Sequence, residues 1–317
     1  MNILIAYDGS PAALTALNDI VRAGLPARAS ATVLTVADVW IPPGDLETAD
    51  SHTPGFPVAI RRARVQAREA LEKARSTAVA GASQLQELKP EWTVKAETTA
   101  DSPAWAVITF AETWPADLIL VGSHGASRLD RLLLGSVSQK ILAEASCSVR
   151  IGRKPRRAAS EPARIVLGLD GSQDSRAAVD AVALREWPAN SEVRFVTAID
   201  DKIQSAAAYP HAPLFQWLHE NDEDYDAWIS RMTASERERL EKRGLRTSVL
   251  VNAADPKAAL VEEAASWDAD TIFVGARGHR MLNRFLLGSV SSAISARALC
   301  SVEVVRQLNE KRTAELR

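Results

Sequence analysis

The strongest constraint on this chain is that its sequence repeats. Residues 116–150 align with residues 269–303 without a gap, and 20 of the 35 positions are identical, where average composition would give about two. A second pair of segments, Ile3–Ser10 (ILIAYDGS) and Ile165–Ser172 (IVLGLDGS), opens each half of the chain. A repeat of about 155 residues is a whole domain rather than a solenoid unit, so the sequence predicts a duplicated domain.

The limits of the two copies follow from this alignment. We expect a first domain over residues 1–152, a linker over 153–163, a second domain over 164–306 and a C-terminal tail over 307–317. The linker is rich in proline, arginine and small residues, which is typical of an exposed connection, with a basic docking segment as the alternative. The first copy has nine more residues between its matched segments, and we place them near the proline-rich stretch 41–57.

The composition is that of a globular protein without a strongly charged partner. Of the 317 residues 46% are hydrophobic and 25% are charged, and the net charge of −2 does not favour a nucleic-acid or anionic-membrane partner. Two cysteines are too few for a disulfide framework. No apolar run reaches the roughly 18 residues of a membrane helix, and the N-terminal run stops at Asp8, unlike a signal peptide. We therefore expect a cytoplasmic protein.

Each copy alternates short apolar runs with amphipathic segments. Runs of Val, Ile and Leu are typical of strands buried on both faces of a parallel sheet, and Ser10-Pro11 is typical of a helix start. The alternation predicts doubly wound α/β domains, whose ligands bind beyond the carboxyl ends of the strands. The expected strands are 3–7, 32–37, 93–97, 118–122 and 149–152, then 165–169, 192–198, 247–251, 271–275 and 302–305, and the expected helices of the first copy are 10–23, 58–88, 102–113 and 136–145.

A glycine pattern, G-x2-G-x9-G-S, follows the fourth expected strand of both copies. Its residues are Gly122, Gly125, Gly135 and Ser136 in the first copy and Gly275, Gly278, Gly288 and Ser289 in the second. Glycines let a backbone approach a phosphate and adopt positive φ, and each serine opens a helix whose free N–H groups favour an anion. Arginines within the nine-residue stretches could offset phosphate charge. They are Arg128, Arg131, Arg280 and Arg284. We predict a phosphate site, with a tight turn that binds nothing as the alternative.

An acidic residue ends the first expected strand of each copy, in the sequence Asp-Gly-Ser. The carboxylates of Asp8 and Asp170 can accept hydrogen bonds from a ribose or an adenine amino group, and capping of the next helix is the alternative role. The second strands end at Ala37-Asp38 and Ile199-Asp200, which we place beside the base. The histidines show no metal-ligand spacing, and no metal site in the protein is predicted.

These residues resemble the universal stress protein family, in its ATP-binding branch, with two copies fused in one chain. The likeness rests on Asp8-Gly9-Ser10, on Asp170-Gly171-Ser172 and on the two glycine patterns, and it covers the chain outside the linker and the tail. It implies in each copy a five-stranded parallel sheet of order 3-2-1-4-5 with helices on both faces. It also implies ATP with Mg²⁺ as the ligand, backbone contacts from Val137 and Val290, and a pseudo-dimer paired through the last strands, with a further homodimer left open.

Three functions compete on this evidence. The first is a nucleotide-binding stress regulator that is not an enzyme, because the glycine patterns lack the lysine of a P-loop and no general base is evident. The second is a slow ATP hydrolase of the adenine nucleotide α-hydrolase superfamily, and the third is a partner-binding scaffold without nucleotide. We expect the first function. The copies differ at Ser123-His124 and Ala276-Arg277, which suggests two sites of unequal affinity.

Overall fold

The computed structural model describes residues 1–39, 58–123, 134–198, 225–252, 254–278 and 287–307. Its first half consists of β1 (Asn2–Ala6), α1 (Pro11–Asp19), a 3-10 turn η1 (Ile20–Arg22), β2 (Ser30–Ala37), α2 (Val58–Leu88), β3 (Thr93–Ala100), α3 (Pro103–Thr113), β4 (Leu118–Gly122), α4 (Ser136–Glu144) and β5 (Ser148–Gly152). Its second half consists of β6 (Arg164–Gly168), α5 (Gln173–Ala183), β7 (Glu192–Ala198), α8 (Tyr225–Glu241), β8 (Arg246–Asn252), α9 (Pro256–Ser266), β9 (Thr271–Gly275), α10 (Ser289–Arg297) and β10 (Ser301–Val305).

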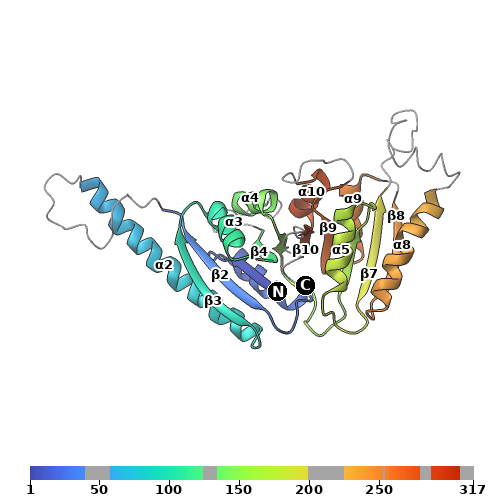
Figure 1. The fold of residues 1–317 in the computed structure, drawn as a ribbon, viewed down its shortest axis with the longest axis horizontal. Helices are drawn as coiled ribbons and strands as arrows, with labels where there is room; N and C mark the ends of the chain where they lie inside the picture. The colour runs from blue at the N-terminus through green and yellow to red at the C-terminus, as the bar shows by residue number, and fades with distance from the viewer. Residues whose placement is uncertain (40–57, 124–133, 199–224, 253, 279–286, 308–317) are drawn as a thin grey trace, which may run out of the picture.

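All these strands belong to one sheet that runs through both halves. Its order is β3-β2-β1-β4-β5-β10-β9-β6-β7-β8, so that β5 and β10 are neighbours in the middle. Figure 1 shows the sheet extending from β3 at one end to β8 at the other. The strands are parallel within each half, whereas β5 and β10 are antiparallel to each other. Each half therefore has the order 3-2-1-4-5, and the predicted doubly wound α/β class is confirmed.

The burial of the strands explains their sequences. Every residue of β4 (LILVG) and β9 (TIFVG) is buried, because these strands lie inside the sheet with helices over both faces. By contrast β3 lies at an edge, and its exposed and half-buried residues alternate. The alternation stops at Glu97, the last three residues are all half-buried, and β3 reaches Ala100 rather than Glu97. Pairing with β2 explains this extension, because the register of the two strands continues until Ala37 pairs with Ala100.

The start of a helix is set by the local sequence where a capping residue is present. Ser10 is the N-cap of α1, and its Oγ accepts the N–H of Ala13 at 3.2 Å, with Pro11 in the first helical position. The helix ends at Asp19 and a 3-10 turn follows, so the expected helix to Ala23 is four residues shorter as an α-helix. Helix α2 has the expected bounds, and it extends past the edge of the sheet (Figure 1).

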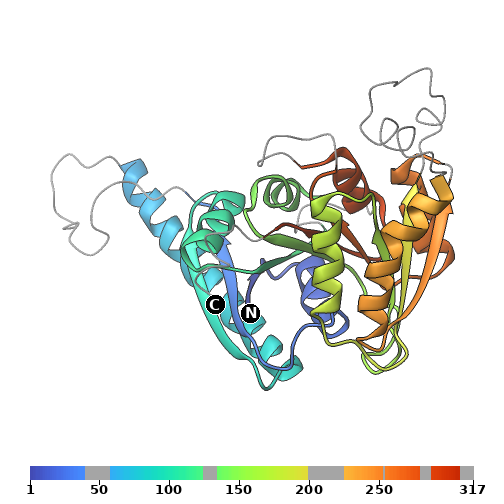
Figure 2. The same ribbon diagram turned by 45° about the vertical axis from the view of Figure 1, so that its right-hand side comes forward.

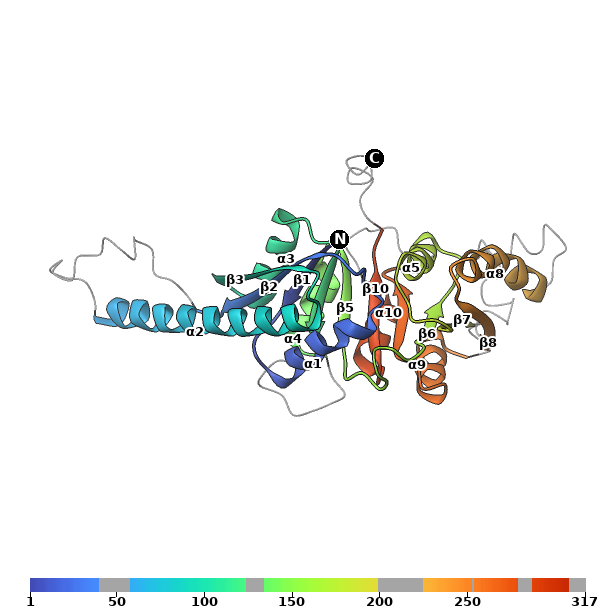
Figure 3. The ribbon, with the colours of Figure 1, turned by 90° about the horizontal axis from the view of Figure 1, so that it is seen from below.

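The two faces of the sheet have different cores. On one face α3, α4, α9 and α10 cover a single apolar cluster that includes residues of both halves, among them Ile141 and Ile294. The other face has two separate clusters, one with residues of α1 and α2 and one with residues of α5 and α8. Figure 2 shows α5 and α8 side by side on the sheet of the second half, and Figure 3 shows α1 beside α2. The shared cluster makes the two halves one packed body.

Charged side chains are buried where the halves meet. Arg150 of β5 pairs with Glu303 of β10 in the antiparallel register, and its Nη1 lies 3.4 Å from Glu303 Oε2 while its Nε donates to Asp19 Oδ2 at 2.7 Å. All three side chains are at most 2% exposed. Arg185, in the second half after α5, also contacts Glu303. These pairs compensate charges that are withdrawn from water.

Two equivalent arginines join each half to the end of a helix in the other half. Arg153 donates to the carbonyls of Ser295 and Cys300 at the end of α10. Arg306 donates to the carbonyls of Leu142 and Cys147 at the end of α4. A cation there satisfies free carbonyls and is favoured by the helix dipole. Among the described residues, no helix is both long and apolar enough to cross a membrane.

Candidate functional site

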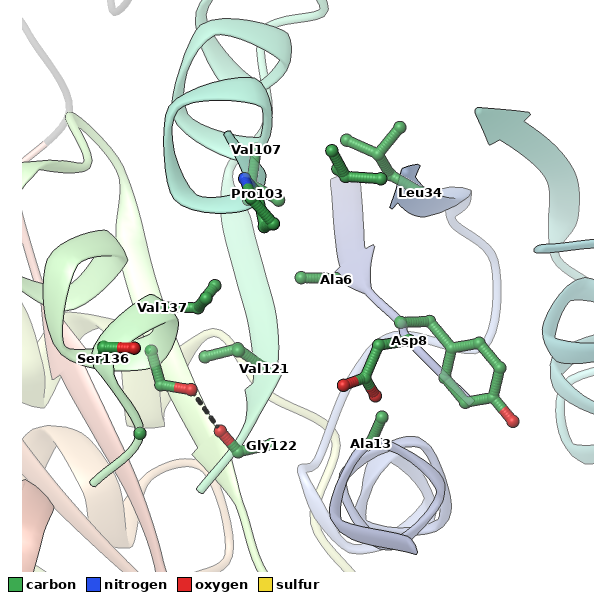
Figure 4. Close-up of a pocket in the computed structure, with 14 residues that line it drawn as sticks. Ala6, Asp8, Ala13, Leu34, Pro103, Val107, Val121, Gly122, Ser136 and Val137 are labelled. Atoms are coloured by element: carbon green, nitrogen blue, oxygen red, sulfur yellow. Dashed lines mark hydrogen bonds between the residues drawn. The ribbon is translucent and has the colours of Figure 1, made fainter. Parts of the chain in front are cut away.

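A cavity of about 180 Å³ opens at the carboxyl ends of β1 and β4 in the first half. These strands are neighbours, with Ala6 beside Val121, so the residues that follow them meet at one edge of the sheet. This is where the strand order reverses, the usual ligand position in such sheets. The cavity is lined by Ala6, Tyr7, Asp8, Ala13, Leu34, Val36, Pro103, Val107, Val121, Gly122, Gly135, Ser136, Val137 and Ser138 (Figure 4).

The inner part of the cavity is apolar. Ala6, Val121 and Leu34 come from three neighbouring strands, and Val107 comes from α3 above them (Figure 4). Tyr7 lies beside Asp8, and burial, together with the charge of Asp8, raises the pKa of the phenol above its usual value. Tyr7 therefore stays neutral in the physiological range. Such walls suit a flat apolar ring with a few polar atoms at its rim.

The carboxylate of Asp8 is held by the turn that follows β1. Its Oδ1 accepts the N–H of Ser10 at 2.9 Å, and Gly9 between them has a φ of +74°, which only glycine adopts without strain. Ser10, rather than Asp8, is the side chain that caps α1. The second half repeats this turn, since Asp170 Oδ1 accepts the N–H of Ser172 at 3.0 Å and Gly171 has a φ of +81°. Asp8 is thus oriented by its turn and lines the cavity.

The first glycine of each pattern is required by packing against a helix start. A Cβ on Gly122 would lie 2.8 Å from the backbone carbon of Ala12, and a Cβ on Gly275 would lie 2.5 Å from that of Asp174. The expectation of positive φ in the patterns is wrong for their described glycines, which all have negative φ. The reason is that these glycines serve a close approach between backbones rather than a left-handed turn.

The N-terminus of α4 forms the polar wall of the cavity. Gly135 is its N-cap and offers no side chain, so the first-turn N–H groups, including those of Ser136 and Val137, have no side-chain cap. The Gly135 N–H donates to the carbonyl of Ser123 at 2.8 Å, and Ser138 Oγ donates to that of Gly122 at 2.6 Å. These two bonds fix the start of the helix against the end of β4. Asp8 and Ser136 then lie on opposite sides of the cavity (Figure 4).

The second half builds the same framework from equivalent residues. The Gly288 N–H donates to the carbonyl of Ala276 at 2.8 Å, and Ser291 Oγ donates to that of Gly275 at 2.7 Å. Ser289 and Val290 are the first residues of α10. Its N-cap residue is Gly288, so this helix start also has no side-chain cap. Gly278 lies against the acidic residue of this half, since a Cβ there would be 2.8 Å from Asp170 Oδ2. Asp170 and the glycine pattern are thus adjacent here too.

Of the residues predicted for the first site, Asp8, Gly122, Gly135, Ser136 and Val137 line one cavity. Ala37 follows Val36 at the end of β2, and its carbonyl accepts the N–H groups of Val39 and Asp101, while Leu34 and Val36 line the cavity. The predictions for Gly125, Arg128, Arg131, Ile199, Asp200, Arg280 and Arg284 lie outside the described residues. Sequence reasoning missed the apolar lining, because such residues also look like ordinary core.

Sequence reasoning also missed an ion pair beside the second site. Arg277 and Asp174 lie 103 positions apart, and Arg277 Nε donates to Asp174 Oδ2 at 2.8 Å. The sequence signal that could have found the pair is a difference between the copies. The first copy has Ala12 at the position where the second has Asp174. Within the described ranges no group of three or more His, Cys, Asp or Glu side chains could hold a metal ion.

The fold and the site together define a class of protein. It has two doubly wound α/β domains, each with an acidic turn and an uncapped helix N-terminus at the point where the strand order reverses. The model of the universal stress protein family matches residues 1–153 and again residues 162–306. The chain therefore belongs to the universal stress protein family and contains two such domains.

Similar proteins support this assignment. A universal stress protein of Mycolicibacterium smegmatis is 30% identical over 227 residues, which cover 68% of this chain and 69% of the relative. One of Mycobacterium tuberculosis is 28% identical over 229 residues, with the same coverage. The crystal structure of a universal stress protein from Archaeoglobus fulgidus matches 98% of this chain and 97% of its own, with a TM-score of 0.66 at 19% sequence identity, which supports the fold.

Proposed function

We propose that the chain binds ATP with Mg²⁺ in the cavity of the first half and acts as a nucleotide-dependent stress regulator in the cytoplasm, without catalysing a reaction. One observation carries the proposal. Asp8 and the uncapped N-terminus of α4 lie on opposite sides of an apolar cavity at the strand ends. This arrangement offers a wall for a base, an acceptor for hydroxyl or amino hydrogens, and donors for phosphate oxygens.

The size of the cavity supports a base as its inner occupant. A cavity of about 150 Å³ holds benzene in another protein, and the cavity here is about 180 Å³. It can therefore take a planar ring system. The ribose and the phosphates would lie beside Asp8, Gly135 and Ser136, the lining residues that provide polar groups.

The donor set supports a phosphate rather than a second base. Amide N–H groups at a helix start carry partial positive charge and point along the helix axis toward an anion. Ser136 adds a hydroxyl at the same place. Phosphate oxygens would supply ligands for Mg²⁺, so the ion needs no cluster of protein carboxylates.

A regulator without catalysis agrees with the chemistry of the lining. Asp8 is the acidic residue of the cavity lining, and its Oδ1 already accepts the N–H of Ser10. The pattern also lacks a P-loop lysine. Binding would then act through the structure, since the site joins β1, β4, α3 and α4, and the last two cover the apolar cluster that both halves share.

The first test replaces Gly135 by valine. The backbone of Gly135, with φ of −63° and ψ of 152°, is in a region that any residue can adopt, and valine adds bulk at the helix start that lines the cavity. We expect Gly135→Val to weaken binding of Mg-ATP at least tenfold in calorimetry, while the variant still unfolds in one cooperative transition. Unchanged affinity in the folded variant would contradict the proposal.

A second measurement identifies the natural ligand. The purified protein is denatured by heat, and the released small molecules are analysed by mass spectrometry. ATP or ADP in the supernatant supports the proposal. If nothing is released and added Mg-ATP changes neither the heat signal nor the melting temperature, the nucleotide-free scaffold replaces it.

A further inference from the structure

The two sites differ in the first turn of the helix that follows the acidic turn. The first half reads Asp8-Gly9-Ser10-Pro11-Ala12 and the second reads Asp170-Gly171-Ser172-Gln173-Asp174. In the aligned sequences of the glycine pattern, the first half has His124 where the second has Arg277. The second half therefore gains an acid and a base that can meet beside the glycine pattern.

In the structure the acid and the base form one closed unit. Arg277 Nε donates to Asp174 Oδ2 at 2.8 Å and Nη2 donates to Oδ1 at 3.1 Å, so the guanidinium binds both oxygens. The backbone N–H of Arg277 donates to the same Oδ2 at 3.0 Å. The Asp174 side chain is 6% exposed and that of Arg277 is 23% exposed. Asp174 also lies in the first turn of α5, where the helix dipole favours a carboxylate.

This pair uses groups that an anionic ligand would need. Arg277 immediately precedes Gly278, and Gly278 faces Asp170, the acidic residue of this site. The guanidinium and the amide of Arg277 are donors next to that position, and both are bound to Asp174. Asp174 also adds a second carboxylate to this half, four residues after Asp170. A phosphate that approached here would compete with Asp174 for its donors and would be repelled by its charge.

The first half cannot form such a pair, because Ala12 has no carboxylate. We infer that the Asp174–Arg277 pair is a latch that lowers the nucleotide affinity of the second half, so that the chain takes up its first nucleotide in the first half. This inference rests on the proposed function, and it adds which site fills first and which residues decide it. The second site becomes equally competent when the latch is removed.

The test is the stoichiometry and affinity of Mg-ATP binding in calorimetry. We expect the wild type to show one tight site, and Asp174→Ala, which reproduces the residue of the first half, to show a second site that is at least tenfold tighter than any second site of the wild type. Asp180→Ala is the matched control, since Asp180 is also on α5 but half exposed in an ion pair with Arg239. The control should behave as the wild type.

Further variants keep the outcomes distinct. Asp8→Asn alone should remove the tight site of the wild type. The double variant with Asp8→Asn and Asp174→Ala should still show the site that Asp174→Ala gains. If Asp174→Ala does not fold, Asp174→Asn keeps an acceptor for the Arg277 N–H without the charge and should gain the second site. Two equal sites in the wild type, or no gain in the folded variants, would overturn the latch alone. No binding by any of these proteins would overturn the proposed function and the latch with it.

Discussion

Single residues shape the site both through the side chains that they have and through the absence of a side chain at glycine. Gly122 and Gly275 have no side chain because the backbone of a helix start lies within 3 Å of the position that a Cβ would take. Gly135 and Gly288 have no side chain to cap the helices that they precede. The first pair of glycines lets the helix approach the strand, and the second leaves its amides available. A single sequence pattern thus serves two different physical requirements.

How far a residue could be predicted depends on how local its role is. Asp8, Gly135 and Ser136 were predictable, because polar residues and glycines at strand ends and helix starts stand out from an apolar background. Val36 and Val107 were not, because a valine that lines a cavity has the same sequence signature as one in a filled core. The Asp174–Arg277 pair depends on a contact across two strand–helix units, which no local pattern contains.

At the residue scale, the thiol of Cys300 should react slowly in the folded protein. Burial raises the pKa of the Cys300 thiol to about 11, against its usual value of 9.0. At pH 8 about one molecule in a thousand then carries the reactive thiolate, instead of about one in ten. We expect Cys147→Ala, which leaves Cys300 as the one thiol, to react with a disulfide reagent far more slowly when native than in guanidinium. The native rate should still rise between pH 8 and pH 10, and a plateau below pH 9 would contradict the prediction.

Whole elements were predicted well wherever burial and caps agree. Strands β4, β7 and β9 and helix α2 have the predicted bounds, because each begins and ends at a clear change of pattern. The end of α1 and the extension of β3 were missed. In the first case a 3-10 turn continues the apolar pattern of the helix, and in the second the pairing with β2 outweighs a polar sequence.

The central strands give an element-scale prediction about stability. Arg150→Met should destabilise the protein by about 3–5 kcal/mol, because it leaves the carboxylate of Asp19 buried without its cation and removes one of the two arginines at Glu303. The measurement is the denaturation midpoint in urea. Arg239→Met, which breaks an exposed pair with Asp180, is the control and should cost less than about 1 kcal/mol. Equal midpoints for the two variants would contradict the importance of the buried charges.

For the whole molecule, the question is whether the linker or the junction holds the halves together. The antiparallel β5–β10 pair, the shared apolar cluster and the reciprocal arginines all cross the junction. The junction should therefore hold without a continuous chain. The linker between Arg153 and Arg164 then serves to bring the halves together and not to keep them there.

This can be measured with a specific protease site inserted between Lys154 and Pro155, where Lys154 is exposed. After cleavage we expect both fragments to elute together with the mass of the intact 34.3 kDa chain. The same result in 1 M salt would show that the buried charges are not screened. Elution as two separate fragments would contradict the prediction.

The pairing of Arg150 with Glu303 has a consequence for how such a chain can evolve. The two positions are equivalent in the two copies, and each faces the other across the junction. In a dimer of identical chains the residue at this place would face itself, so any charge there would meet its like, and every mutation would appear twice. Fusion of two gene copies removes that restriction. Each side can then change alone, and a complementary pair of charges that identical subunits cannot have becomes reachable one substitution at a time.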